Sequence, residues 1–188
     1  MFFLYAIPVG LLAGWLAGGR LERLADVRFR LAPLAVLALA VQLVLFSPLA
    51  DGLPKDLGRA VYVISTALVV IVVLANVRLA GVPLVVLGAV LNLAAIVANG
   101  GAMPARPEAL AALGYGVGGN TNSVVLDHPV LEPLTDVFAM PAWMPLANVF
   151  SAGDVLIGLG IAIALAAAMR GRPGGRRPAF DESAGPPA

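Results

Sequence analysis

Five long apolar runs constrain this chain more than any other feature of its sequence. Each is about as long as the ~20 residues that a helix needs to cross the hydrocarbon core of a bilayer. Because lipid offers no partner to open backbone groups, such runs are helical rather than extended. The sequence therefore predicts an all-α fold, a polytopic membrane helix bundle with five transmembrane helices. The predicted spans are residues 2–19, 31–49, 60–75, 79–98 and about 149–169.

Composition supports the same class. Of the 188 residues, 60% are hydrophobic and 12% are charged, whereas a soluble domain carries roughly 25% charged residues. The chain has no cysteine and a single histidine, His128, which excludes disulfides, thiolate nucleophiles and Cys-ligated metals. Its glycine-rich stretches lack the Lys-Ser/Thr pair of a nucleotide-binding loop. We expect no metal, no cofactor and no nucleic-acid partner.

The distribution of basic residues predicts the orientation of the bundle. Nine of the twelve Lys and Arg residues lie in the loop 20–30, at position 78 and after residue 169, all on one side of the predicted bilayer. The positive-inside rule therefore places the N-terminus outside and the C-terminus in the cytoplasm. The first run lacks a basic n-region, so we expect an uncleaved helix. Residues 171–188 are rich in Gly, Pro and charge, which predicts a disordered cytoplasmic tail.

The outer loop between the fourth and fifth runs, residues 99–148, is the most informative region. Loops longer than ~15 residues are uncommon unless they are functional or disordered. Within it, "PEALAALG" predicts a short helix that begins at Pro107 and is capped by Gly114. The following "PVLEPLTDVFAMPAWMPL" mixes large apolar residues with prolines. We expect this loop to form a lid that folds back onto the membrane surface or the bundle.

Polar residues gather on this outer side. Asn92 lies two helical turns below Asn99 on the same helix face. Polar side chains within spanning segments are costly to bury and point to a functional site, although Asn and Gln also join helices by hydrogen bonds. We interpret Gln42 as a residue of that second kind. The candidate binding residues are Asn92, Asn99, Asn120, Asn122, Asn148 and Trp143.

Asp154, near the start of the last run, has two readings. "SAGD" has the spacing of a capping box, with Ser151 as N-cap and Asp154 as the reciprocal acceptor. Alternatively, Asp154 and Asp136 form a catalytic pair of carboxylates that share one proton, activate water and protonate a leaving group. The helix-cap reading is favoured, and the acid pair stays open.

Gly10, Gly14 and Gly18 form two overlapping Gly-x-x-x-Gly steps in the first run. Such a face lets a neighbouring helix backbone approach closely. The neighbour is a helix of the same chain, which we favour, or a helix of another copy or membrane protein.

Several motifs carry a resemblance to a known family. They are "NGGAMP", "PEALAALG", "GGNTNS" and "NVFSAGDVLIGLG". With them the chain resembles an uncharacterised bacterial family of small multi-pass membrane proteins, a domain of unknown function. The resemblance implies a multi-pass fold in the bacterial inner (plasma) membrane and no assigned activity.

The last ~50 residues also show a fainter similarity to the lipoprotein signal peptidases, which are aspartyl proteases of the bacterial membrane. That similarity implies Asp154 at the outer start of the final helix and Asp136 as the upstream acid. In the hypothesis of an aspartate-dependent hydrolase, we expect Asn99 or Asn120 to orient the substrate. The chain departs from the family pattern near Asn120, where "NTNS" has neither acid nor arginine. It also places Asn148 six residues before Asp154 instead of three.

Three functions remain as hypotheses. The first is a non-enzymatic membrane protein that binds a partner or membrane lipid through the outer loop. The second is an aspartate-dependent membrane hydrolase. The third, a small-solute permease subunit, ranks last because we see no internal repeat and no helix interrupted near the bilayer centre.

Overall fold

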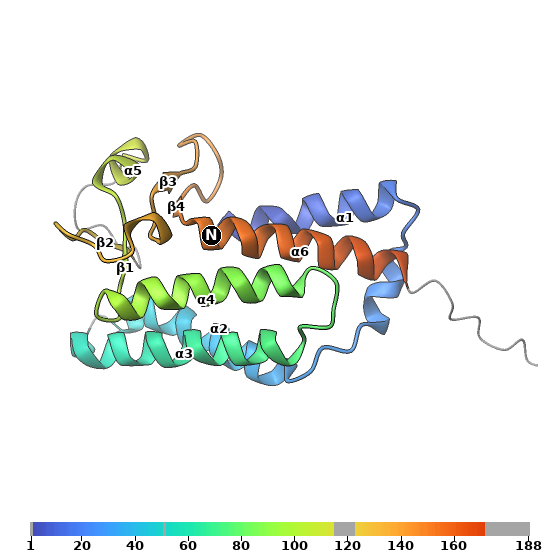
Figure 1. Ribbon diagram of the computed structural model, residues 1–188, viewed down its shortest axis with the longest axis horizontal. Coiled ribbons are helices and arrows are strands. Elements are labelled where there is room, and N and C mark those ends of the chain that lie inside the picture. Colours follow the sequence, from blue (N-terminus) through green and yellow to red (C-terminus); the bar gives the residue numbers. More distant parts are fainter. Residues whose placement is uncertain (1, 51, 115–122, 172–188) are drawn as a thin grey trace, which may run out of the picture.

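The computed structural model describes residues 2–50, 52–114 and 123–171. Two candidate binding residues, Asn120 and Asn122, lie outside the described residues, as does nearly all of the predicted tail. The described chain is mostly helical, and Figure 1 shows its long helices running side by side, with α5 and the short strands gathered at one end. The long helices are α1 (Ala6–Leu16), α2 (Ala32–Leu45), α3 (Lys55–Ala75), α4 (Val82–Ala98) and α6 (Ala152–Arg170).

The long helices coincide with the five apolar runs, with small differences at their ends. A 3-10 turn, η1 (Phe2–Tyr5), precedes α1, so the first run is helical almost from its start. The third helix begins at Lys55, five residues before the apolar run, because polar and charged residues can still form its exposed first turn. Two further 3-10 turns, η2 (Leu21–Asp26) and η3 (Pro48–Ala50), follow α1 and α2.

Length and hydropathy separate these helices into two groups. Helices α3 and α6 are long and apolar enough to cross a membrane, whereas the segments Phe2–Leu16, Ala32–Leu45 and Val82–Ala98 are apolar but shorter. The structure thus supports a helical chain with two candidate spans.

Helix α6 lies between α1 and α4, and glycines on both sides allow the close approach. A Cβ added at Gly10 would lie 2.8 Å from the Ala162 Cα atom, and one at Gly14 would lie 3.1 Å from the Ala166 Cα atom. The glycine face of α1 therefore packs on α6 of the same chain. Gly18, with a φ of +76° and open space around it, follows the helix instead of sharing its interface.

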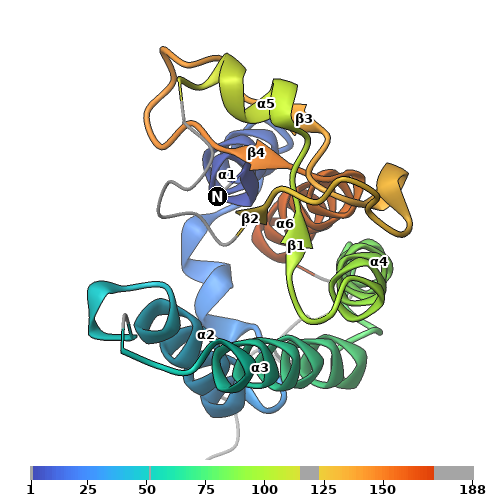
Figure 2. The same ribbon diagram turned by 90° about the vertical axis from the view of Figure 1, so that its left-hand side faces the viewer.

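The remaining helices pack in the order α2, α3, α4 (Figure 2). Gln42 of α2 donates hydrogen bonds to the hydroxyl oxygens of Ser65 and Thr66 in α3, both at 3.2 Å. This contact confirms the interpretation of Gln42 as a residue that joins helices. Between α3 and α4 a compact apolar core forms from Val70, Val73, Val82 and Ala89.

Residues 99–114 and 123–148 form a small cap over the end of the bundle where α4 ends and α6 begins (Figure 1). The predicted short helix is confirmed as α5 (Pro107–Ala112), and Gly114 follows it with a φ of +73°. The cap has its own apolar core, made of Ala105, Ala109, Leu110 and Val149.

Short strands, which the sequence did not suggest, tie the cap together. Strand β1 (Met103–Pro104) pairs in parallel with β2 (Ser123–Val124). Strand β3 (Phe138–Ala139) pairs antiparallel with β4 (Val149–Phe150), which leads directly into α6. A 3-10 turn, η4 (Glu132–Leu134), lies between the two pairs along the chain.

Candidate functional site

Three polar side chains meet between α4 and the start of α6: Asn92, Ser151 and Asp154. The Asn92 amide nitrogen donates to Oδ1 of Asp154 at 3.0 Å, and the Ser151 hydroxyl lies 2.8 Å from Oδ1 of Asn92. Ser151 is fully buried, and the other two side chains are partly buried. We call these residues the Asn92 cluster.

The Asn92 cluster contains the predicted capping box. Ser151 Oγ accepts from the Asp154 backbone N–H at 3.0 Å, and Asp154 Oδ2 accepts from the Ser151 backbone N–H at 3.0 Å. The extended backbone of Ser151 places its side chain over the first turn, as an N-cap requires. The carboxylate also lies at the positive end of the α6 dipole. Both carboxylate oxygens of Asp154 therefore have structural partners.

Gly153 makes this arrangement possible. A Cβ at position 153 would overlap the side-chain oxygen of Asn92, and one at Gly88 would overlap the carbonyl oxygen of Gly153. Because both residues lack a side chain, α4 and α6 come close enough for Asn92 to reach Asp154. The sequence pointed to Asn92 as a polar residue within a span, but it did not identify this partner.

Asp136 lies in the cap, outside helices α4 and α6, which carry the Asn92 cluster. It lies between η4 and β3, and it is only 5% exposed. Its backbone N–H donates to Pro104 at 2.9 Å, and its carbonyl oxygen accepts from Arg106 at 3.0 Å. Its backbone thus crosslinks the cap, and its catalytic role stays a prediction.

Asn99 fastens the cap to the end of α4. Its amide nitrogen donates to Ala95 O at 2.7 Å and to Val130 O at 2.8 Å, while its side-chain oxygen accepts from the Val130 N–H at 2.8 Å. The Asn99 side chain thus pairs with both the C=O and the N–H of Val130, as the backbone of a neighbouring strand would. These bonds give Asn99 a structural role, although it was selected as a binding residue.

The remaining candidates in the cap differ in exposure. Asn148 uses its side-chain oxygen locally, as acceptor for the N–H of Val149 at 2.9 Å. Trp143 is 82% exposed. Both residues lie in the loop between β3 and β4, and their binding role together with Asn92 and Asn99 stays a prediction.

Two other residues have structural roles that the sequence analysis missed. Asn76, buried after α3, donates to Arg30 O at 2.8 Å and accepts from the Arg30 N–H at 2.7 Å. It repeats the geometry of Asn99 at the end of a different helix, and an Asn just after an apolar run is the signal they share. Arg23 donates to the last carbonyls of α6, those of Met169 and Arg170, where a cation complements the helix dipole.

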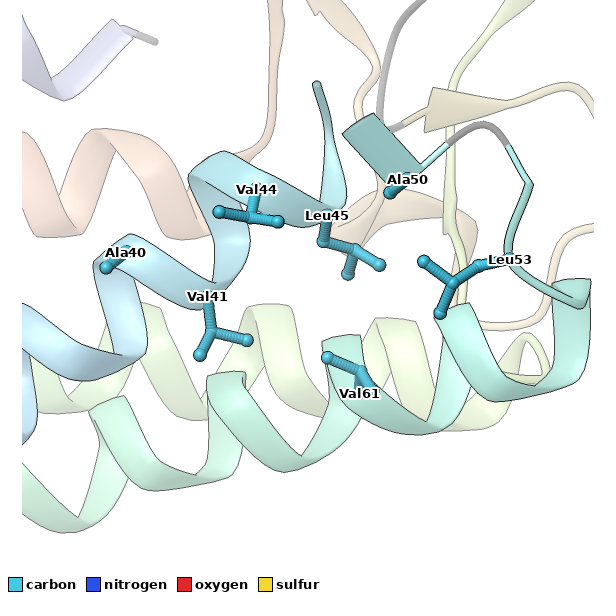
Figure 3. Close-up of a pocket in the computed structure, with 7 residues that line it drawn as sticks. All are labelled: Ala40, Val41, Val44, Leu45, Ala50, Leu53 and Val61. Atoms are coloured by element: carbon cyan, nitrogen blue, oxygen red, sulfur yellow. The ribbon is translucent and has the colours of Figure 1, made fainter. Parts of the chain in front are cut away.

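An apolar pocket of about 370 Å³ lies between α2, η3 and α3 (Figure 3). No polar side chain lines it, so it offers no group for acid–base or nucleophilic chemistry. Its lining residues are Ala40, Val41, Val44, Leu45, Ala50, Leu53 and Val61. Across the described residues, no group of three or more His, Asp or Glu side chains is placed to hold a metal ion.

The chain was compared with known families, curated proteins and solved structures. No curated protein and no solved structure matches it. A family model described as a family of unknown function (DUF5317) matches residues 26–166, which run from the end of η2 to well inside α6. This match covers the cap, the Asn92 cluster and four of the five long helices. Because it extends over most of the sequence, the chain belongs to the DUF5317 family.

Proposed function

We propose that this protein is a multi-pass integral membrane protein of the bacterial inner membrane, whose cap binds a lipid or protein partner without catalysing a reaction. Its five long helices would be the spans, with the N-terminus and the cap outside and the C-terminus in the cytoplasm. Described basic residues near the helix ends opposite the cap support this orientation: Arg20, Arg23, Arg28, Arg30, Arg78 and Arg170.

Exposed aliphatic side chains support the membrane location. Soluble monomers rarely expose contiguous apolar patches of more than a few hundred Å². Here helix α2 packs mainly against α3, and most of its remaining surface is aliphatic. The exposed large residues of α2 include Leu34, Val36, Leu37, Leu39 and Leu43. Helices α3 and α4 add Ile64, Ile71, Leu87 and Val90.

The shorter helices fit this proposal when their flanking turns are included. Helix α2 has 14 residues, or about 21 Å at 1.5 Å per residue, against a hydrocarbon core of about 30 Å. Its apolar sequence continues through Phe46 into η3. A bilayer also adapts to short spans by local thinning at modest cost.

The bonding of Asp154 is the observation that carries the non-enzymatic proposal. A catalytic acid or base must exchange a proton with a substrate or water within hydrogen-bond reach. Both oxygens of Asp154 are instead bonded to Ser151 and Asn92, so a helix cap and an interhelical contact account for this carboxylate.

One observation favours the alternative, an aspartate-dependent hydrolase: the Asp136 carboxylate is buried in the cap. Purified protein in detergent or vesicles would be incubated with a fluorogenic lipopeptide, beside D136N and D154N. We expect no cleavage above that of the two variants. Cleavage by the parent chain that both substitutions abolish would establish the hydrolase instead.

The absence of cysteine from the sequence makes the topology directly measurable. Single substitutions D127C in the cap and D26C at the end of η2 place one thiol at each predicted surface, both at exposed positions. In intact cells, a membrane-impermeant maleimide should label D127C at once and D26C only after permeabilisation. Labelling of both thiols from outside, or recovery of the protein in the soluble fraction, would contradict the proposal.

A further inference from the structure

The loop between β3 and β4, residues 140–148, exposes large apolar side chains; we call it the tip loop. Trp143 is 82% exposed and Leu146 is 68% exposed. No Asp, Glu, Lys, Arg or His occurs anywhere from residue 137 to residue 153. An exposed, uncharged segment of this kind marks a surface that meets another apolar phase.

Two contacts hold the tip loop at the start of α1. The Tyr5 hydroxyl donates to the carbonyl oxygen of Pro145. At the base of the loop, the ring of Phe150 stacks on that of Phe2, with centroids 4.4 Å apart. Both Phe2 and Tyr5 belong to η1, the turn that leads into α1. The tip loop is therefore fixed at the level where the first helix reaches the end of the bundle.

The tip loop reaches sideways from the bundle and not straight out along its axis. Figure 2 shows the loop between β3 and β4 passing beside α1, on the side of α1 that is turned away from α4. In Figure 1 it lies above the adjoining ends of α1 and α6. If α1 spans the bilayer, this overhang lies over the lipid that surrounds α1.

The backbone of the tip loop satisfies many of its own hydrogen bonds. Met144 N–H donates to Pro141 O at 3.0 Å, and Ala147 N–H donates to Met144 O at 3.2 Å. Met140 N–H closes the base by donating to Asn148 O at 3.1 Å. Pro141 and Pro145 have no N–H to satisfy. These bonds lower the cost of moving this backbone out of water, because the groups that form them keep their partners.

Leu146 adds a conformational observation. Its φ is +56°, in the left-handed region that non-glycine residues seldom occupy. This exposed leucine is therefore held in an uncommon conformation with its side chain in solvent. Strained residues of this sort concentrate at binding sites and ligand clamps.

We infer that the tip loop is a membrane-interface anchor, which inserts Trp143 and Leu146 between the headgroups and acyl chains of the lipid beside α1. The inference rests on the proposed membrane location and names lipid as the occupant of this edge of the cap. Tryptophan suits that boundary because its ring is largely apolar and its N–H still reaches polar partners. The anchor holds the cap down against the membrane surface.

The two tryptophans of the chain, Trp15 and Trp143, make the test possible. The variant W15F leaves Trp143 as the sole reporter, and W143F leaves Trp15, which is exposed on α1. Each would be reconstituted in vesicles whose lipids carry bromine at either a shallow or a deep acyl position. We expect Trp143 to be quenched more by the shallow bromines than by the deep ones and to be shielded from aqueous acrylamide.

The outcomes separate the inference from the proposed function. If Trp15 is quenched by bromolipid while Trp143 is not, the protein is in the membrane and the anchor is overturned. If Trp143 is shielded from acrylamide without bromolipid quenching, a protein surface covers the tip loop and the inference is also wrong. If neither tryptophan is quenched, the membrane proposal itself fails.

A second pair of variants tests the role of the loop residues. In the W15F background, L146D should reduce the bromolipid quenching of Trp143, because a carboxylate cannot enter the boundary without losing hydration. The matched control is L131D, since Leu131 is also an exposed leucine of the cap with a positive φ but lies at η4. Equal quenching in L146D and L131D would contradict the anchor.

Discussion

The side-chain amide of Asn92 donates to the Asp154 carboxylate across 62 residues of sequence, at 3.0 Å. Asn92 lies within α4, and Asp154 lies in the first turn of α6. The Asp154 carboxylate thus accepts the N–H of the N-cap residue of its own helix and also bonds the neighbouring helix. The capping box and this interhelical bond give Asp154 a structural role, while its catalytic pairing with Asp136 stays a prediction.

The capping network should contribute measurably to stability. S151A removes the acceptor of the Asp154 N–H and should lower the free energy of unfolding by about 1 kcal/mol, as for other N-caps. D154A should cost more, because it also leaves the Asn92 amide without its acceptor. Reversible unfolding in detergent would measure both. D127N, in an exposed part of the cap, serves as the control and should be neutral.

Close helix contact at Gly160 predicts a steric effect. A Cβ there would lie 2.6 Å from the Gly81 carbonyl oxygen and 2.9 Å from the Val85 backbone nitrogen. G160A should therefore destabilise the chain by about 1–3 kcal/mol, the range for overpacked sites. At Gly58 of α3 the nearest atom is 3.8 Å away, so G58A should be neutral or slightly stabilising. Thermal unfolding of both variants tests this prediction. Equal melting midpoints for G160A and G58A would show that α4 and α6 are not in close contact.

Asn99 should control the attachment of the cap. N99D replaces the donor to the carbonyl oxygens of Ala95 and Val130 with a second acceptor, so these bonds are lost. Hydrogen exchange of the backbone around Val130 should accelerate, while exchange within α4 changes little. N148D is the matched control, because the Asn148 side chain is used as an acceptor for Val149 N–H and a carboxylate still accepts. Similar exchange in both variants would refute the role of Asn99.

Gln42 and Asn76 should respond differently to replacement by leucine. After Q42L, the hydroxyls of Ser65 and Thr66 still donate to the carbonyl oxygen of Tyr62. The loss should stay near 0.6 kcal/mol, the average for hydrogen bonds between membrane helices. N76L leaves the backbone N–H and C=O of Arg30 without their side-chain partner, and each lost bond should cost about 1 kcal/mol. When the free energy of unfolding is measured in detergent, Q42L should be more stable than N76L.

Local sequence patterns predicted most of what is local in this fold. The five long helices, the short helix α5 and the Ser151–Asp154 box each follow from residues within one or two turns of one another. Those patterns depend on apolar length and on cap chemistry, which the order of the residues displays directly.

Contacts between distant segments could not be predicted in the same way. Asn99 was recognised as polar, but its partner Val130 depends on how the cap folds, and Asn76 depends on the return of the chain at Arg30. The glycine face at Gly10 and Gly14 indicated close packing without naming α6. The sequence shows which side chains need a partner, but only the three-dimensional structure shows which residue that partner is.

The position of α6 between α1 and α4 has a consequence for biosynthesis. The glycine face of α1 is complementary to the helix that is translated after the other four long ones. Until α6 is synthesised, Gly10 and Gly14 lack the helix that they pack against in the complete fold. The bundle is therefore complete only when α6, the last long helix of the chain, has packed between α1 and α4.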